Sequence, residues 1–166
     1  MRNLIALPLI AGAVILQSAI ISRVQLLSGY ADILLVILAA WALQEHVRSP
    51  WQWALVGAVF TSFISHLPWP VVFIGYFSVV YFARILSRRI WQVPLAAMFG
   101  VTLLGTLIFH FVSFVTLSLV GTPLPVPQVI GWITLPSLLL NTILAVPVYI
   151  LIRDISFWVY PSPESI

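Results

Sequence analysis

Three histidines and four acidic residues are the side chains of this chain that could do acid–base or metal chemistry. His46 directly follows Glu45, whereas His66 and His110 stand apart from the acids. Two metal ligands share one helix face when they lie four residues apart, and no histidine here has that spacing from another histidine or a carboxylate. The chain also lacks cysteine, which excludes thiolate nucleophiles and sulfur-bound metals. We therefore expect no catalytic residue, metal or cofactor, and we interpret each histidine as a boundary or helix-packing residue.

Asp32 is the one acid that the sequence could carry into the hydrocarbon of a membrane. An ionised side chain at the bilayer centre costs roughly 2.5–3.5 kcal/mol on insertion scales, and this cost falls toward the boundary. Asp32 stands near the start of an apolar stretch, with Arg23 on the same predicted side. We expect Asp32 to begin a helix or to pair with Arg23, and a functional site is the alternative. An enzyme would need a second convergent group, and no second carboxylate is predicted on that side.

Small and polar residues recur at four-residue steps in two later segments, which places each set on one face of a helix. Such stripes usually pack one helix against another, with about 0.6 kcal/mol per interhelical hydrogen bond. A ligand cavity is the alternative interpretation. The first stripe is Gly57, Thr61 and Ser65, and the second is Thr102, Thr106 and His110.

The last apolar segment has the most distinctive sequence pattern of the chain, because polar residues and prolines interrupt it. Ser137 and Asn141 lie four residues apart and share a face. An unpaired amide in the middle of a membrane would be costly, so we expect Asn141 to face another helix. Pro136 and Pro147 are about three helical turns apart and are expected to bend this helix toward the same side.

The elements that position these residues follow from composition. Hydrophobic residues make up 62% of the chain and charged residues only 7%, against about a quarter in soluble domains. The bilayer must therefore be the main solvent, and continuous apolar stretches favour helices over a barrel. The fold class that we predict is an all-α polytopic membrane protein, one compact bundle of six transmembrane helices with short loops, in a single domain of residues 1–166. The predicted spans are about 4–22, 30–44, 51–66, 70–87, 93–120 and 129–152.

Arginines set the orientation of this bundle. Arg23 falls on one side of the six spans and the other six arginines on the opposite side, so the positive-inside rule predicts cytoplasmic N- and C-termini. Because they stand at segment ends and form no basic stripe, they do not indicate nucleic acid binding. Arg84, Arg88 and Arg89 form a cytoplasmic basic cluster that could contact a partner or anionic lipid. Tryptophans are expected as boundary anchors, with Trp41, Trp51, Trp53, Trp91 and Trp158 inside and Trp69 and Trp132 outside.

Several pieces of the chain, in order, resemble the rod shape-determining protein MreD family. The first segment ends in Leu16–Ser18, and the second begins with Ala31–Leu35, similar to the family's Pro-Asp-Leu-Leu. The strongest match is Leu135–Asn141, which reads Leu-Pro-Ser-x-Leu-x-Asn, followed by Ala145–Tyr149. The chain departs from the family in lacking an aspartate over residues 61–66 and in having alanine where the family has proline before Asp32.

This resemblance implies a non-enzymatic scaffold in the bacterial cytoplasmic (inner) membrane that crosses it several times. The implied partners are an MreC-like protein, a RodA-type glycosyltransferase with its transpeptidase, and MreB filaments, together with membrane lipids. The implied role is cell shape, through lateral peptidoglycan synthesis by the elongation complex.

Two other functions stay open. The stripe that ends at His110 could belong to a small-molecule binding subunit, similar to the vitamin-binding components of energy-coupling-factor transporters. A membrane enzyme acting on a lipid-linked substrate would depend on Asp32 and His66.

Overall fold

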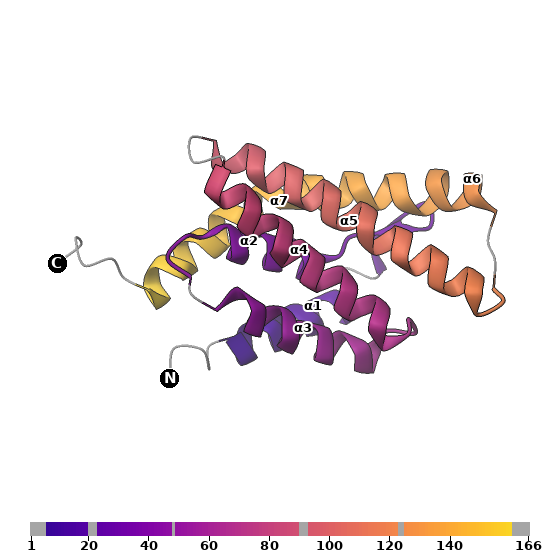
Figure 1. Cartoon of the computed structure of the whole chain (residues 1–166), viewed down its shortest axis with the longest axis horizontal. Helices are drawn as coiled ribbons and strands as arrows, with labels where there is room; N and C mark the ends of the chain where they lie inside the picture. The colour runs from indigo at the N-terminus through magenta and orange to yellow at the C-terminus, as the bar shows by residue number, and fades with distance from the viewer. Residues whose placement is uncertain (1–5, 20–22, 48, 90–92, 123–124, 161–166) are drawn as a thin grey trace.

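The computed structural model describes residues 6–19, 23–47, 49–89, 93–122 and 125–160, which form an almost entirely helical bundle (Figure 1). Each of the six predicted segments contains a helix. A pair of two-residue strands, β1 (Gln25–Leu26) and β2 (Gly29–Tyr30), connects the first helix to the second. The helices are α1 (Ala6–Ala19), α2 (Ile33–Leu43), α3 (Pro50–Ile64), α4 (Trp69–Arg89), α5 (Pro94–Leu119), α6 (Val126–Gln128), the π-helix η3 (Val129–Thr134) and α7 (Leu135–Val159).

Three of these helical stretches are long and apolar enough to cross a membrane, which identifies a membrane protein. They are Trp69–Arg88, Pro94–Leu119 and the continuous stretch Val126–Val159. Helix α2 has 11 residues, so at about 1.5 Å per residue it is roughly 16 Å long, about half of a hydrocarbon core. Helices α1 and α3 are also shorter than a full crossing, with 14 and 15 residues.

Helix α2 lies within the predicted second span, and an antiparallel hairpin precedes it. Gln25 pairs with Tyr30 and Leu26 with Gly29, and the turn places Leu27 at a φ of 57°. The hairpin is fixed to the last helical stretch, since the Ser28 N–H donates to the Trp132 carbonyl at 3.0 Å. That carbonyl is available because Pro136, four residues later, has no N–H to donate to it.

The last helix continues to Val159, so its predicted end at residue 152 was wrong. The charged pair Arg153 and Asp154 suggested a boundary, but both side chains are exposed. Ser156 and Val159 are buried on the inner face, and their packing continues the helix beyond the charges.

Helix α2 is the centre of the bundle. All of its residues are buried, and α1, α3, α4, α5 and α7 all contact it. A helix that is apolar on every side can be stable only when other helices surround it. Figure 1 shows α2 behind α4 and between the outer helices.

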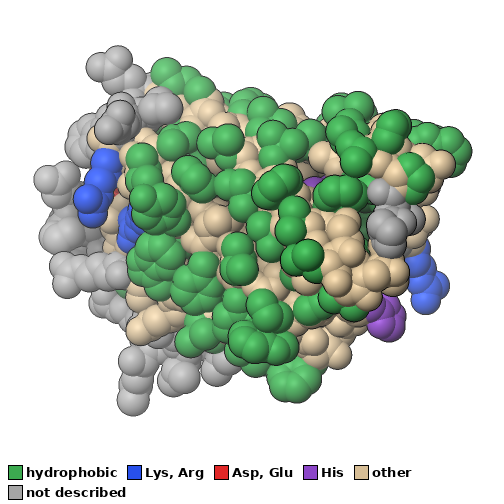
Figure 2. Space-filling view, turned by 45° about the vertical axis from the view of Figure 1, so that its right-hand side comes forward, with side chains coloured by type: hydrophobic (Ala, Val, Ile, Leu, Met, Phe, Trp, Pro, Cys, Tyr) green, Lys and Arg blue, Asp and Glu red, His purple; other side chains and the backbone are tan. Residues whose placement is uncertain are grey.

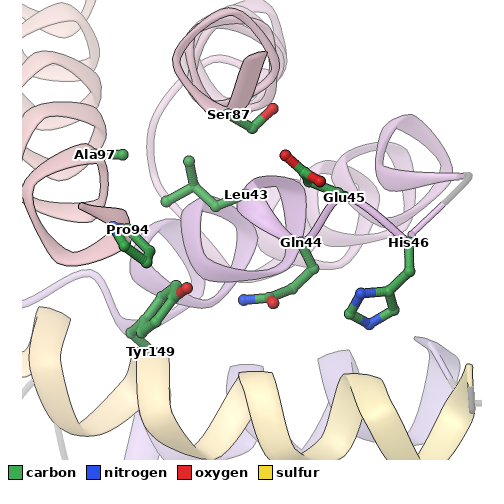
Figure 3. Close-up of a pocket in the computed structure, with 8 residues that line it drawn as sticks. All are labelled: Leu43, Gln44, Glu45, His46, Ser87, Pro94, Ala97 and Tyr149. Carbon is green, nitrogen blue, oxygen red and sulfur yellow. The ribbon is translucent and has the colours of Figure 1, made fainter. Parts of the chain in front are cut away.

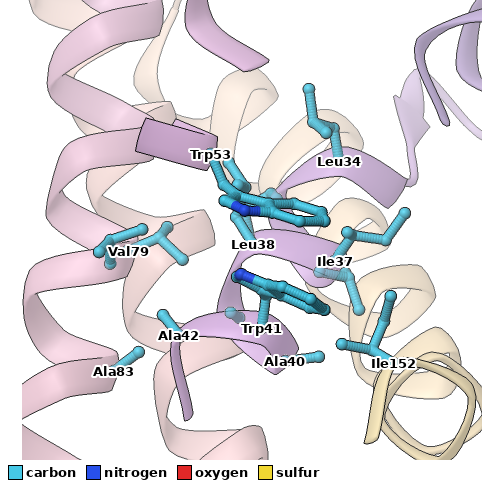
Figure 4. Packing of buried hydrophobic residues seen from close by; sticks show 14 of the residues in the cluster. Leu34, Ile37, Leu38, Ala40, Trp41, Ala42, Trp53, Val79, Ala83 and Ile152 are labelled. Atoms are coloured by element: carbon cyan, nitrogen blue, oxygen red, sulfur yellow. The ribbon is translucent and has the colours of Figure 1, made fainter. Parts of the chain in front are cut away.

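Trp41 of α2 and Trp53 of α3 stack at 3.9 Å between ring centroids in this core. Figure 4 shows the two rings one above the other, with Val79 and Ile152 on opposite sides. Both tryptophans have no exposed surface, so their prediction as membrane-boundary anchors was wrong. Trp51, Trp69, Trp132 and Trp158 are exposed, as boundary residues would be, and Trp91 lies outside the described residues.

The bundle has two different ends. The termini end contains the start of α1, the end of α7 and the α2–α3 connection, and the hairpin end contains β1–β2, the α3–α4 connection and η3 (Figure 1). The face drawn in Figure 2 is covered by apolar side chains, and arginine side chains are seen only near its two margins. This distribution fits a body that meets lipid around its middle.

Candidate functional site

Four segments meet at the hairpin end through a set of hydrogen bonds that we call the polar joint. The Asp32 backbone N–H donates to Asn141 Oδ1 at 2.7 Å, and the Tyr30 N–H donates to Ser137 Oγ at 3.2 Å. Asn141 Nδ2 in turn donates to Thr106 Oγ1 at 2.9 Å. The joint therefore ties β2 and the start of α2 to α5 and α7, across more than 100 residues of sequence between Asp32 and Asn141.

Both polar atoms of the Asn141 amide are hydrogen-bonded, and the residue is only 1% exposed. The Thr106 hydroxyl donates its own proton to the Thr102 carbonyl at 2.8 Å, so its oxygen is free to accept from Asn141. The prediction that Asn141 faces another helix is confirmed. Leaving one partner of such a buried pair unsatisfied would cost about 1–3 kcal/mol.

Gln17 of α1 holds the backbone that leads into α2. Its Nε2 donates to the Ala31 carbonyl at 2.7 Å, and its Oε1 accepts from the Ile33 N–H at 2.9 Å. Both amide atoms thus bind the extended segment on either side of Asp32. Sequence reasoning noted Gln17 only within a motif and did not assign it to the site.

Asp32 begins α2, as one of its two predicted roles required. Its Oδ1 accepts from the Leu35 N–H at 2.9 Å, the usual hydrogen bond of an N-cap. The Tyr76 hydroxyl lies 3.4 Å from both carboxylate oxygens, which is long for a hydroxyl hydrogen bond. The ion pair with Arg23 is not formed, since the one ion pair within the described ranges joins Arg153 to Asp154 at 3.1 Å.

The negative charge of Asp32 is therefore only partly offset by its surroundings. A helix N-terminus stabilises an anion by about 0.3–1 kcal/mol at exposed sites and up to about 2 kcal/mol when partly buried. Removing a carboxylate from water costs several kcal/mol even after the protein relaxes. The difference leaves Asp32 with capacity for a further donor or a positive charge.

Asp32 lines a cavity of about 580 Å³ at the hairpin end, which we call the Asp32 cavity. Small-molecule sites commonly have volumes of roughly 300–1,000 Å³. Residues of its wall that are themselves exposed, Ser18, Tyr30, Ile64 and His66, mark its mouth. Its polar lining residues are Gln17, Ser18, Tyr30, Asp32, Thr61, Ser65, His66, Tyr76, Thr106, His110 and Asn141.

Both predicted stripes reach this cavity. From α3, Thr61 Oγ1 lies 3.4 Å from the Tyr76 hydroxyl, and Ser65 Oγ accepts from the Leu67 N–H at 3.1 Å in the following turn. Gly57 lies deeper, where an added Cβ would be 3.3 Å from Leu34 Cδ2. This position therefore allows α3 to approach α2 closely.

From α5, Thr106 and His110 line the cavity, whereas Thr102 lies beyond it. His110 Nδ1 is 3.1 Å from Thr134 Oγ1 of η3. Thr102 Oγ1 is buried and has no hydrogen-bond partner among the described atoms. In α7, Pro136 is buried beside the hairpin and Pro147 is exposed.

Asp32 and His66, the pair on which an enzyme would depend, line the same cavity. No hydrogen bond or ion pair joins them within the part of the chain that the structure describes. Over the same residues, no group of three or more histidine or acidic side chains could hold a metal ion.

A second, smaller pocket of about 250 Å³ lies at the termini end, beside Glu45, His46 and Tyr149 (Figure 3). Figure 3 shows the Glu45 carboxylate turned toward Ser87 and the His46 ring turned the other way. His46 Nε2 lies 3.0 Å from Ser156 Oγ, and that hydroxyl donates to the Arg153 carbonyl at 2.6 Å. Ser156 therefore accepts from His46, which is the opposite of a nucleophile activated by a histidine base.

Burial lowers the pKa of His46, and the Ser156 hydrogen bond and the Glu45 charge offset only part of this effect. The neutral imidazole is thus the form that the folded protein favours. Its ring also stacks on Phe157, with 4.9 Å between centroids. These contacts indicate that His46 fixes the α2–α3 connection against α7.

The basic cluster is divided between two roles. The Arg84 guanidinium donates to the carbonyls of Val47 and, at 3.4 Å, of Gln44, where α2 ends. A cation at this place satisfies carbonyls that a helix C-terminus leaves free. Arg88 is exposed and shares a groove of about 760 Å³ with Arg84 and Glu45, and the Arg89 side chain lies outside the described ones.

Comparison of the chain with models of protein families, with curated proteins and with solved structures finds no match.

Proposed function

We propose that the protein is a non-enzymatic scaffold in the bacterial cytoplasmic membrane, part of the complex that elongates rod-shaped cells. In this proposal six segments form the membrane body, both termini are cytoplasmic, and the hairpin end faces outward. An MreC-like protein binds the body, and a RodA-type glycosyltransferase with its transpeptidase and MreB filaments associate with the assembly.

The polar joint is the observation that supports this proposal best. Three of the pieces that resemble the MreD family are Leu16–Ser18, Ala31–Leu35 and Leu135–Asn141. In the folded chain the second and third pieces touch, through Asp32 and Asn141 at 2.7 Å. Gln17 of the first piece binds the Ala31 carbonyl and the Ile33 N–H on either side of Asp32. Three matching pieces of sequence thus build one structural unit, as expected of residues that define a family of membrane bodies.

Co-purification tests the scaffold. The full chain, expressed with a tagged MreC-like single-span protein from the same genome, should be recovered with it in mild detergent. An unrelated single-span protein with the same tag is the control. Consistent recovery of the chain alone, with both proteins present in the membrane, would remove the proposal.

A basic-cluster variant sharpens this test. Arg88→Gln combined with Arg89→Gln leaves Arg84 in place, because Arg84 holds the end of α2. If the basic cluster binds a cytoplasmic partner, recovery of MreB should fall several-fold while that of the MreC-like protein is kept. Arg153→Gln, at the same end of the bundle, is the matched control, and unchanged recovery in the double variant would make the cluster a topology signal alone.

A second candidate function is binding of a small molecule, and the Asp32 cavity favours it. Its volume of about 580 Å³ and its many polar lining groups suit a solute better than a packing defect. Screening vitamin-sized solutes for a rise in the unfolding temperature of the protein in lipid nanodiscs would test this candidate. No rise with any solute would count against it.

A further inference from the structure

The Asp32 cavity has a charge that its own walls do not balance. Arginine and lysine are absent from its described lining, and Asp32 is the one carboxylate there. His66 and His110 are the lining residues that could carry a positive charge. Neither forms an ion pair with Asp32 in the described structure, and His110 is bonded to Thr134 instead.

The carboxylate is also incompletely bonded on the side where it meets the cavity. Its hydrogen bonds from the backbone come from the Leu35 N–H, at the start of α2, and from the Leu34 N–H. The Tyr76 hydroxyl lies at 3.4 Å from each oxygen and can move closer only if the α4 side chain shifts. An ionised carboxylate can accept about four hydrogen bonds, so acceptor capacity remains.

Aromatic rings surround the same space. Tyr30, Tyr76 and Phe109 all line the cavity, and Tyr76 stacks on Phe109 with 5.7 Å between ring centroids. Aromatic faces attract cations because of their quadrupole, and this attraction is larger where water is excluded. A carboxylate and several aromatic side chains lining one cavity form a combination that suits organic ammonium groups.

We propose that the Asp32 cavity binds a small organic cation, an amine or quaternary ammonium compound, with Asp32 as its counter-charge and the rings of Tyr76 and Phe109 along its apolar part. This inference rests on the second candidate function, that the cavity is a binding site. An anionic ligand would meet Asp32 without any arginine or lysine to offset it. A neutral ligand would leave the carboxylate unbalanced.

Three probes of similar shape and different charge test the proposal: para-fluorobenzylamine, para-fluorobenzyl alcohol and para-fluorobenzoate. Binding to the full chain in lipid nanodiscs is measured by fluorine NMR, with empty nanodiscs as the blank for partition into lipid. The amine should bind about tenfold tighter than the alcohol, and the benzoate should bind weakest.

Asp32→Asn is the decisive variant, because asparagine also serves as an N-cap and keeps the start of α2. The advantage of the amine over the alcohol should fall from about tenfold to near onefold in this variant. Asp154→Asn removes the same charge from an exposed site outside the cavity and should leave the advantage unchanged. The ranking of the three probes in the unmodified protein needs no variant and serves as the second measurement.

The outcomes distinguish failure of this inference from failure of the second candidate function, on which it rests. Equal binding of the amine and the alcohol, or an amine advantage that persists in Asp32→Asn, would overturn the cation proposal while the cavity remained a binding site. Binding of none of the three probes above the empty-nanodisc blank would overturn both.

Discussion

In the core around Trp41 and Trp53, toward the termini end, the helices pack on α2 through apolar and aromatic side chains, whereas at the hairpin end they meet through polar side chains around a cavity. The stacked Trp41 and Trp53 are fully buried, yet their Nε1–H groups have no partner among the described atoms. At the other end the amide of Asn141 is bonded on both sides. The tryptophan core thus accepts unpaired indole N–H groups in exchange for close packing, whereas the polar joint pairs its buried amide beside a cavity.

This difference separates stability from function within one small bundle. Close packing of large side chains contributes most to stability, so we expect substitutions at the termini end to be the most costly. Hydrogen bonds between membrane helices contribute less on average, so a polar joint is better explained by a need for defined geometry.

The largest loss of stability is expected from Trp53→Ala. Removal of the indole leaves a void against Trp41 in the centre of the bundle, and such changes cost about 3–5 kcal/mol of stability. This loss of stability can be measured by following unfolding in mixed micelles as the fraction of denaturing detergent is increased. Trp69→Ala, at an exposed position, is the control, and equal losses in the two variants would contradict a core centred on α2.

A somewhat smaller loss is expected from Gly29→Ala, at the contact between the hairpin and the last helix. An added Cβ would lie 2.6 Å from the Ile133 carbonyl oxygen and 2.9 Å from the Ser137 nitrogen, and backbone atoms cannot turn aside. Overpacking of this kind costs about 1–3 kcal/mol. Gly12→Ala, with nothing within 4 Å of its added Cβ, should show no comparable loss in the same unfolding measurement.

Asn141→Leu should cost about 1–2 kcal/mol, less than Trp53→Ala. It removes the acceptor of the Asp32 N–H and the donor to Thr106, but membrane hydrogen bonds seldom contribute more than about 1.7 kcal/mol each. Thr142→Val is the neighbouring control, because that hydroxyl bonds only within its own helix, to the Leu138 carbonyl. A loss as large as that of Trp53→Ala would make the joint the main source of stability and reverse the comparison.

The smallest effect is a pH dependence at His46. Since burial lowers the pKa of His46 below its ordinary 6.5, the unfolded chain binds a proton that the folded protein resists. Stability should therefore be full above about pH 6.5 and decrease as the pH falls through that value. His46→Gln should reduce the difference in unfolding temperature between about pH 7.5 and pH 5.5. An unchanged difference in His46→Gln would assign the pH dependence to other groups.

Sequence patterns predicted the parts of this molecule whose physics is local. Six apolar segments, the helix start at Asp32 and the inward face of Asn141 follow from length, capping chemistry and the cost of an unpaired amide. Helix α2 offered a further signal, since Ile33–Leu43 is apolar on every side, which is typical of a surrounded helix. That signal would also have predicted Trp41 as a core residue.

The contacts that complete the site depend on how separate segments meet, and no local pattern encodes that. Tyr76 lies in a helix with many aromatic residues, and nothing in its spacing distinguishes it as the neighbour of Asp32. The hairpin was missed because each of its strands has only two residues. The extension of α7 past Arg153 was missed because a charged pair can lie on the exposed face of a continuing helix.

Placement of single cysteines tests the central claim most directly, that the two ends of the bundle face opposite sides of the membrane. The chain has no cysteine of its own, so each introduced thiol reports alone. All four chosen positions are exposed: Ser28→Cys and Thr122→Cys at the hairpin end, and Glu45→Cys and Asp154→Cys at the termini end. In intact cells a membrane-impermeant maleimide should label the first two variants, and should label the last two only after permeabilisation. Labelling of both pairs from the same side would contradict the account.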